Sequence, residues 1–189
     1  MADMKQHLVR YLHQGRDALL WKLDGLDDYD ARRPLVPTGT NLLGLVKHVA
    51  ATSAGYFGHV FGRPFDEVLW MYEQDDLLVD LWCPADESRD DVLGLWERAW
   101  AHSDATISEL PIDAAGRVPW WPEERADVTL GQILLHMTAE LNRHVGHADI
   151  VRELIDGAAG LRPDATNMPA GQDWQAHYDR VEAAARTAR

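Results

Sequence analysis

Apolar residues recur at three- and four-residue intervals in four long segments of the chain, at 3–23, 41–61, 88–110 and 129–156. This spacing places them on one face of an α-helix, whereas the strict alternation that is typical of strands is nearly absent. A shorter terminal segment, 173–185, shows the same helical spacing. The pattern therefore predicts an all-α fold.

Signals for helix ends support three of these segments. Ser88, with Asp91 three residues later, opens the segment 88–110 with a variant of the capping box. Thr129 is followed three residues later by Gln132, which is the arrangement of a capping box, and Gly157 lies just past the predicted end of that helix. For the segment that follows the first long loop, we expect Thr38 or Thr40 to be the N-cap.

Long, mixed connections join the predicted helices. The connections at 62–87 and 111–128 have no sustained helical spacing, apart from a short helix that we expect at 75–81. Loops of this length in a compact domain usually have a task, such as covering a site. We predict a four-helix bundle at 1–160, followed by a loop and helix at 161–189 that pack on it.

Composition and charge narrow the class of protein. The 189 residues suit one domain, and a hydrophobic share of 46% is enough for a substantial core. The net charge of −13 argues against nonspecific binding to nucleic acid or to anionic membranes. The N-terminal residues lack the apolar centre of a signal peptide, and no run of about 18 apolar residues occurs. We therefore expect a cytoplasmic protein with no nucleic-acid or membrane partner.

The single cysteine, Cys83, excludes an internal disulfide framework and a zinc site built from several cysteines. Its acidic neighbours would raise the pKa of its thiol, so a role as a catalytic nucleophile is disfavoured. The candidate chemistry of this chain therefore lies with its histidines and carboxylates.

One face of the last long segment carries a polar stripe. With His136 placed at 0° on a helical wheel, Glu140, His144 and His147 fall at roughly 40°, 80° and 20°. Apolar residues flank the stripe, so the carboxylate is at least half buried and needs a compensating partner. A divalent metal ion is one such partner, because side chains four residues apart can converge on one ion.

One ion cannot use the whole stripe, because His136 and His147 lie about 16 Å apart along the helix axis. A third ligand must come from another helix, and His48 is the best candidate because it sits between apolar residues in the middle of its segment. His59 lies three turns further along and should miss such a site. Spacing alone leaves a second interpretation open, in which the stripe forms a hydrogen-bonded network without metal.

Two stretches carry a resemblance to a known family. "TNLLGLVKHVA" with "YFGHVFGRP", and later "HMTAELNRHVGHADIVRELIDG", resemble the DinB-like superfamily. The match is closest to its actinobacterial branch, a domain family of unknown function related to mycothiol-dependent maleylpyruvate isomerases. This resemblance implies a four-helix bundle that holds a divalent metal, often zinc or nickel, through three side chains. It assigns the ligands to His48, Glu140 and His144, because the isomerase branch has Glu where many members have a first His.

The resemblance also implies an activity, in which the metal holds a mycothiol-type thiol as thiolate for attack on a small electrophile. We therefore expect a metal-dependent thiol S-transferase or isomerase. His147, Arg143 and His136 are expected around the ligands, as hydrogen-bond partners or as lining of the site. Iron or manganese would also suit this donor set.

The sequence leaves several points as alternatives. Tyr56, Trp120 and Trp121 are candidates for the wall of a substrate pocket. A metal-dependent hydrolase would need an additional general base, for which His147 or Asp149 could serve. A non-catalytic, metal-binding stress-response bundle is a further interpretation. A homodimer is an alternative to a monomer.

Overall fold

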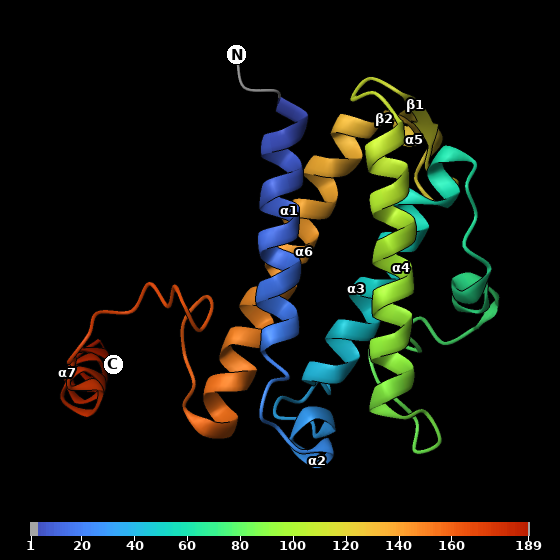
Figure 1. Ribbon diagram of the computed structural model, residues 1–189. Coiled ribbons are helices and arrows are strands. Elements are labelled where there is room, and N and C mark those ends of the chain that lie inside the picture. Colours follow the sequence, from blue (N-terminus) through green and yellow to red (C-terminus); the bar gives the residue numbers. More distant parts are fainter. Residues whose placement is uncertain (1–3, 189) are drawn as a thin grey trace.

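The computed structural model describes residues 4–188, which form a bundle of long helices (Figure 1). The predicted start of the first helix at residue 3 lies outside the described residues. The bundle consists of α1 (Met4–Trp21), α3 (Leu42–Phe57), α4 (Arg89–Glu109) and α6 (Leu130–Asp156). The prediction of an all-α fold with an extra C-terminal helix is confirmed.

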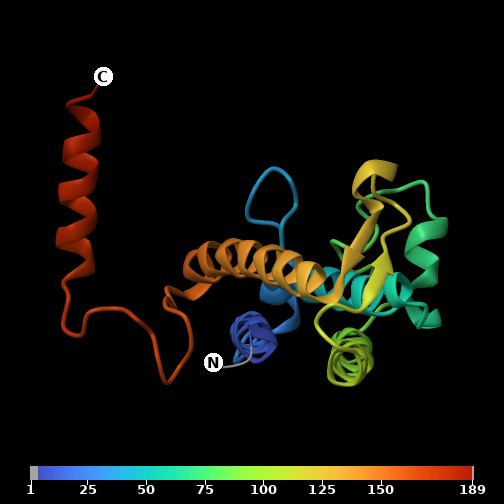
Figure 2. The ribbon, with the colours of Figure 1, turned by 90° about the horizontal axis from the view of Figure 1, so that it is seen from above.

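The four long helices form two layers. α6 packs against α1 and α3, and α3 packs against α4. Seen from above, α1 and α4 lie on one side of the layer made by α3 and α6 (Figure 2). The core lies between the layers because each helix buries one apolar face. Its fully or almost fully buried members include Leu12, Leu19, Leu43, Val49, Phe57, Trp100, Ile133, Met137 and Leu141.

Polar contacts also join α1 to α4, the two helices of one layer. The carboxylate of Asp104 on α4 bonds His13 Nε2 at 2.8 Å and accepts from Arg16 Nη1 at 2.9 Å. Lys5 donates to the backbone oxygen of Leu110 at 2.6 Å. These polar contacts thus link the two helices along their length.

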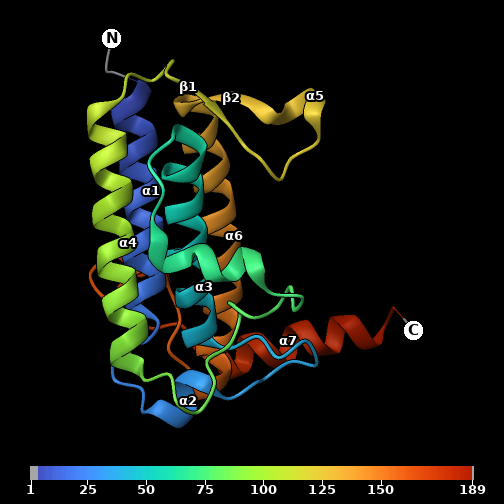
Figure 3. The same cartoon turned by 90° about the vertical axis from the view of Figure 1, so that its right-hand side faces the viewer.

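The long connections contain short elements that the sequence pattern did not predict. They are α2 (Asp28–Arg32), the 3₁₀ helix η2 (Asp66–Glu73), α5 (Glu123–Ala126), and the strands β1 (Ala115–Arg117) and β2 (Asp127–Thr129). A second 3₁₀ helix, η1 (His59–Phe61), lies at the end of the predicted helical segment 41–61, because α3 already ends at Phe57 with Gly58 as its C-cap. β1 and β2 pair antiparallel, with Gly116 opposite Val128. Figure 3 shows η2 lying over α3, and the β1–α5–β2 unit beside the start of α6.

The prediction of a short helix at 75–81 is wrong. The chain there forms turns, and the 3₁₀ helix η2 lies before it in the sequence. Side chains of α3 hold this segment by its backbone carbonyls, because Asn41 bonds Leu81 and Lys47 bonds Val79 and Trp82. These tertiary hydrogen bonds replace those that a helix would make.

The helix ends agree in part with the sequence signals. Thr129 and Gln132 form the predicted capping box at the start of α6, and Gly157 ends the helix in the left-handed region at φ 76°. The predicted N-cap of α3 at Thr38 or Thr40 is wrong, because the side chain of Asn41 accepts from the amide of Gly44 at 2.8 Å.

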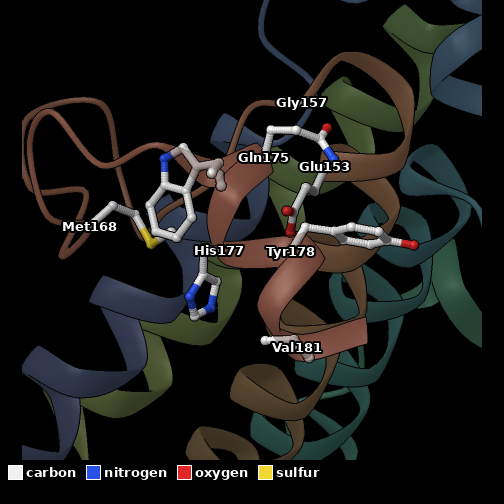
Figure 4. Close-up of a pocket in the computed structure, with 9 residues that line it drawn as sticks. Glu153, Gly157, Met168, Gln175, His177, Tyr178 and Val181 are labelled. Atoms are coloured by element: carbon white, nitrogen blue, oxygen red, sulfur yellow. The ribbon is translucent and has the colours of Figure 1, made fainter. Parts of the chain in front are cut away.

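The terminal helix α7 (Trp174–Arg186) exists as predicted but is not packed into the bundle: none of its residues is buried. It stands apart near the end of α6 (Figures 1 and 2). A cavity of about 560 Å³ lies between the two helices, lined by side chains such as Glu153, Met168, Trp174 and Tyr178 (Figure 4). The larger apolar side chains of α7, Trp174, Tyr178 and Val181, are exposed and line this cavity. The packing of residues 161–189 on the bundle stays a prediction.

None of the described helices has the length and apolar character needed to cross a membrane.

Candidate metal centre

His48, Glu140 and His144 come together at the middle of the bundle, where α3 packs against α6. One ligand atom from each lies within 4.8 Å of the others. His144 Nε2 is 2.9 Å from Glu140 Oε1, and His48 Nε2 is 3.9 Å from the same oxygen. The structure thus brings together the three residues that the sequence and the family resemblance single out.

The helices present these side chains for simple reasons. Glu140 and His144 are one turn apart on α6, so they project in nearly the same direction. His48 lies between the buried residues Leu45 and Val49 on α3, so its ring turns toward α6 rather than toward solvent. The two imidazole rings have their centroids 4.7 Å apart. His59, as expected, does not belong to this group.

Asp80 completes the surroundings of His48, and sequence reasoning missed it. Asp80 Oδ2 lies 2.7 Å from His48 Nδ1, and the residue is buried. Because a carboxylate only accepts, Nδ1 carries the hydrogen and Nε2 presents a lone pair. The only sequence signal for Asp80 is an acid among apolar residues in "LLVDLW", within a long loop.

A glycine allows the loop of Asp80 to approach α3. A Cβ atom added to Gly44 would lie 2.0 Å from the backbone oxygen of Leu81, so any larger residue would push this loop away. Lys47, itself buried, adds an ion pair with Glu87 at 2.7 Å. Because Gly44 lies one turn before His48, the close approach places Asp80 beside the ring of His48.

The donor atoms fit a metal ion chemically. The lone pair of His48 Nε2 faces Glu140 Oε1 at 3.9 Å, which is too long for a hydrogen bond, and neither atom then offers a hydrogen. Donors bound to one tetrahedral ion at about 2.0–2.2 Å lie about 3.3–3.6 Å apart, so small side-chain shifts would suffice. A cation between these atoms would satisfy both, and it would replace the hydrogen between His144 and Glu140.

Electrostatics favour the protonation states that metal ligands require. Burial and the nearby ring of His48 lower the pKa of His144, so its neutral form is favoured. Burial opposes ionisation of Glu140, but the hydrogen bond from His144 and the positive charge nearby, including that of Arg143, outweigh it. The pKa of Glu140 therefore lies below its ordinary value, which favours the carboxylate.

The three residues expected around the ligands occupy different places. His147 Nδ1 lies 3.4 Å from His144 Nδ1, so it can hold that ring from the side away from Glu140. Arg143 is exposed and acts on Glu140 through its charge. His136 packs against the rings of Tyr56 and Trp121, and within the described part of the chain no hydrogen bond joins it to Glu140. Burial lowers the pKa of His136.

A cavity of about 310 Å³ opens onto the cluster. It is lined by His48, Thr52, Tyr56, Met71, Trp120, His136 and Glu140. Met71 comes from η2 and Trp120 from the segment between β1 and α5, so both long connections contribute to its wall. Trp121, the next residue, donates to the hydroxyl oxygen of Tyr56 at 3.1 Å. Asp149, a candidate base from the sequence, instead pairs with Lys22 at 2.6 Å.

The sequence of the chain also matches the model of a known protein family. The model of the mycothiol-S-transferase family matches residues 7–157, which extend from α1 to the end of α6 and include all three clustered residues. No curated protein matches the chain significantly. Because the match covers most of the chain, the protein belongs to the mycothiol-S-transferase family.

Proposed function

We propose that the protein is a divalent-metal-dependent S-transferase that joins a mycothiol-type thiol to a small electrophile. The observation that carries this proposal is the convergence of His48, Glu140 and His144 within 4.8 Å at the mouth of a cavity, in a chain of the mycothiol-S-transferase family. Three protein ligands leave coordination positions open, which suits a catalytic metal better than a structural one.

His48, Glu140 and His144 would hold the ion. When bound, the ion supplies the Lewis acidity that keeps a thiol in its thiolate form near neutral pH. Asp80 fixes the ring of His48 so that Nε2 faces the cluster, and His147 can do the same for His144. Zinc or nickel is the expected ion, whereas iron or manganese would also accept this donor set.

The cavity would receive the electrophile. The rings of Tyr56 and Trp120 and the side chain of Met71 give it an apolar wall that excludes water from the reacting atoms. Glu140 and His48 form its polar end. A small, largely apolar molecule therefore suits it, whereas a large polar one does not. A homodimer in the cytoplasm stays a prediction for this protein.

The test is thiol-dependent turnover. Purified protein with zinc should conjugate mycothiol to monochlorobimane, and Glu140→Gln should abolish this activity by removing a charged ligand. Glu97→Gln, at an exposed position on α4, is the matched control and should keep the wild-type rate. Consumption of the bimane at equal rates without thiol would contradict the proposal and indicate hydrolysis.

A further inference from the structure

The hydroxyl oxygen of Tyr56 accepts two hydrogen bonds from neighbouring indoles. Trp120 Nε1 lies 3.3 Å from this oxygen and Trp121 Nε1 lies 3.1 Å from it. An indole N–H can only donate, and a phenolic oxygen has two lone pairs and one hydrogen. Both lone pairs are therefore occupied, and the hydroxyl group can act further only as a donor.

The hydrogen of this hydroxyl has no acceptor within the described part of the chain. The ring of His136 packs against that of Tyr56, with centroids 4.8 Å apart, and makes no hydrogen bond to the hydroxyl group. Tyr56 lines the same cavity as His48 and Glu140. A polar hydrogen in a cavity with apolar walls calls for an acceptor on the ligand, because a donor left unsatisfied on ligand binding is costly.

We propose that Tyr56 donates a hydrogen bond to an oxygen of the electrophile, so that the preferred substrates are small planar molecules with a carbonyl group conjugated to the reacting carbon. This inference rests on the proposed function. The indole hydrogen bonds to the hydroxyl oxygen polarise the O–H bond and strengthen it as a donor. A cavity of about 310 Å³ is at the small end of ligand sites, so one ring with a short substituent fits it.

The chemistry is an addition to a conjugated carbonyl compound. The thiolate sulfur forms a bond to the β carbon, and the π electrons of the C=C bond move toward the carbonyl to give an enolate. The charge that develops on the enolate oxygen strengthens the hydrogen bond from Tyr56. Water then protonates the α carbon, and the resulting hydroxide takes the proton that the thiol released. The net change is addition of S–H across C=C, without an oxidant or a reductant.

Two electrophiles with one ring each distinguish the hydrogen bond from Tyr56 to the carbonyl oxygen from the thiol-transfer activity as such. Phenyl vinyl ketone develops charge on oxygen during thiol addition, whereas benzyl chloride loses chloride and has no oxygen. We expect Tyr56→Phe to lower kcat/KM for the ketone by about 10–100-fold, the worth of one hydrogen bond to a charged group. The rate with benzyl chloride should change little, which also shows that the variant is folded. Tyr29→Phe, at an exposed position on α2, should leave both rates unchanged.

A binding experiment on metal-free protein gives a readout that needs no turnover. Acetophenone and ethylbenzene differ by the carbonyl oxygen, and neither reacts with thiols. Wild-type protein should bind acetophenone several-fold more tightly in an NMR titration, and Tyr56→Phe should lose this preference. An unchanged preference, or an equal loss of rate with both electrophiles, would overturn the role of Tyr56. If wild-type protein conjugates neither electrophile, the proposed function is wrong, and the acetophenone titration still decides whether Tyr56 recognises the oxygen.

Discussion

A single carboxylate decides which nitrogen of His48 faces the cluster. Asp80 accepts from Nδ1 at 2.7 Å, so Nε2 is the atom that points toward Glu140. Without this partner the ring is free to rotate, and both tautomers become accessible. Carboxylate partners of this kind commonly contribute 10–100-fold to metal affinity.

We therefore predict that Asp80→Ala lowers zinc affinity by about 10–100-fold, measured by competition with a chromogenic chelator. Asp80→Asn should lie between this variant and wild type, because its amide oxygen still accepts a hydrogen bond. Asp75→Ala changes an exposed acid of the same connection and should have no effect. Equal affinities for Asp80→Ala and Asp75→Ala would show that Asp80 does not position the ligand.

Some residues of the candidate site can be predicted from the sequence, and others cannot. Glu140 and His144 are visible because they share a helical face, and His48 because a histidine among apolar residues needs a partner. Asp80 is not visible, because its position depends on how a loop without regular structure crosses α3. Tyr56, Trp120 and Trp121 are indicated only by residue type, since a hydrogen bond between residues about 65 positions apart leaves no local pattern.

At the scale of the elements, two helical glycines have opposite surroundings. A Cβ atom on Gly44 of α3 would lie 2.0 Å from the backbone oxygen of Leu81, whereas one on Gly146 of α6 would meet nothing within 4 Å. Alanine is a better helix former than glycine by about 1 kcal/mol where space allows. The effects of alanine at Gly44 and at Gly146 on stability should therefore differ only because of the atoms around each position.

We expect Gly44→Ala to destabilise the protein by about 1–3 kcal/mol, because the loop of Asp80 must move and buried groups lose hydrogen bonds. Gly146→Ala should raise stability by up to about 1 kcal/mol. Urea denaturation of the two variants and the wild type measures both effects. A Gly44→Ala variant as stable as Gly146→Ala would contradict the close approach of the loop.

The long helices were predictable and the short elements were not, for a physical reason. Each bundle helix buries an apolar face over at least four turns, so the periodic pattern is repeated often enough to be recognised. β1, β2 and α2 contain only three to five residues each and are stabilised by tertiary contacts. Their sequences carry too few positions for a period to appear.

The C-terminal segment ends in α7, whose residues are all exposed. We propose that residues 1–160 fold independently, because no residue of α7 is buried. A chain ending at residue 166, which keeps the contact of Lys22 with the backbone oxygen of Gly160, should unfold within about 2 °C of the full-length protein. A decrease of 10 °C or more in Tm would show that α7 stabilises the bundle.

At the scale of the whole molecule, ion pairs across α1 and α4 make stability depend on pH. Burial opposes ionisation of Asp104, but its hydrogen bonds and charge interactions with His13 and Arg16 outweigh this, and its pKa lies below the ordinary value. The unfolded chain therefore takes up this proton at a higher pH than the folded one. The stabilising contribution is complete above about pH 5 and is lost as the pH falls through 4 and below.

Asp104→Asn measures this contribution. At pH 7 the variant should be less stable than wild type by about 1 kcal/mol or less, because Asp104 is more than one third exposed and solvent screens its ion pairs. The difference in the free energy of unfolding should shrink toward zero as the pH is lowered from 5 to 3. A difference that stays constant over this range would rule out the carboxylate charge as its source.

In the fold as a whole, one face of α3 packs against one face of α6, and these two helices carry the three clustered residues. The two long connections lie over them (Figure 3). The most direct test of the proposed metal centre is the metal content of protein purified without chelators. Elemental analysis should find about one divalent ion per chain in wild type, little in His144→Ala, and the wild-type amount in His177→Ala, an exposed position on α7. Metal-free wild-type protein that also fails to bind added zinc, or His144→Ala with the full metal content, would contradict it.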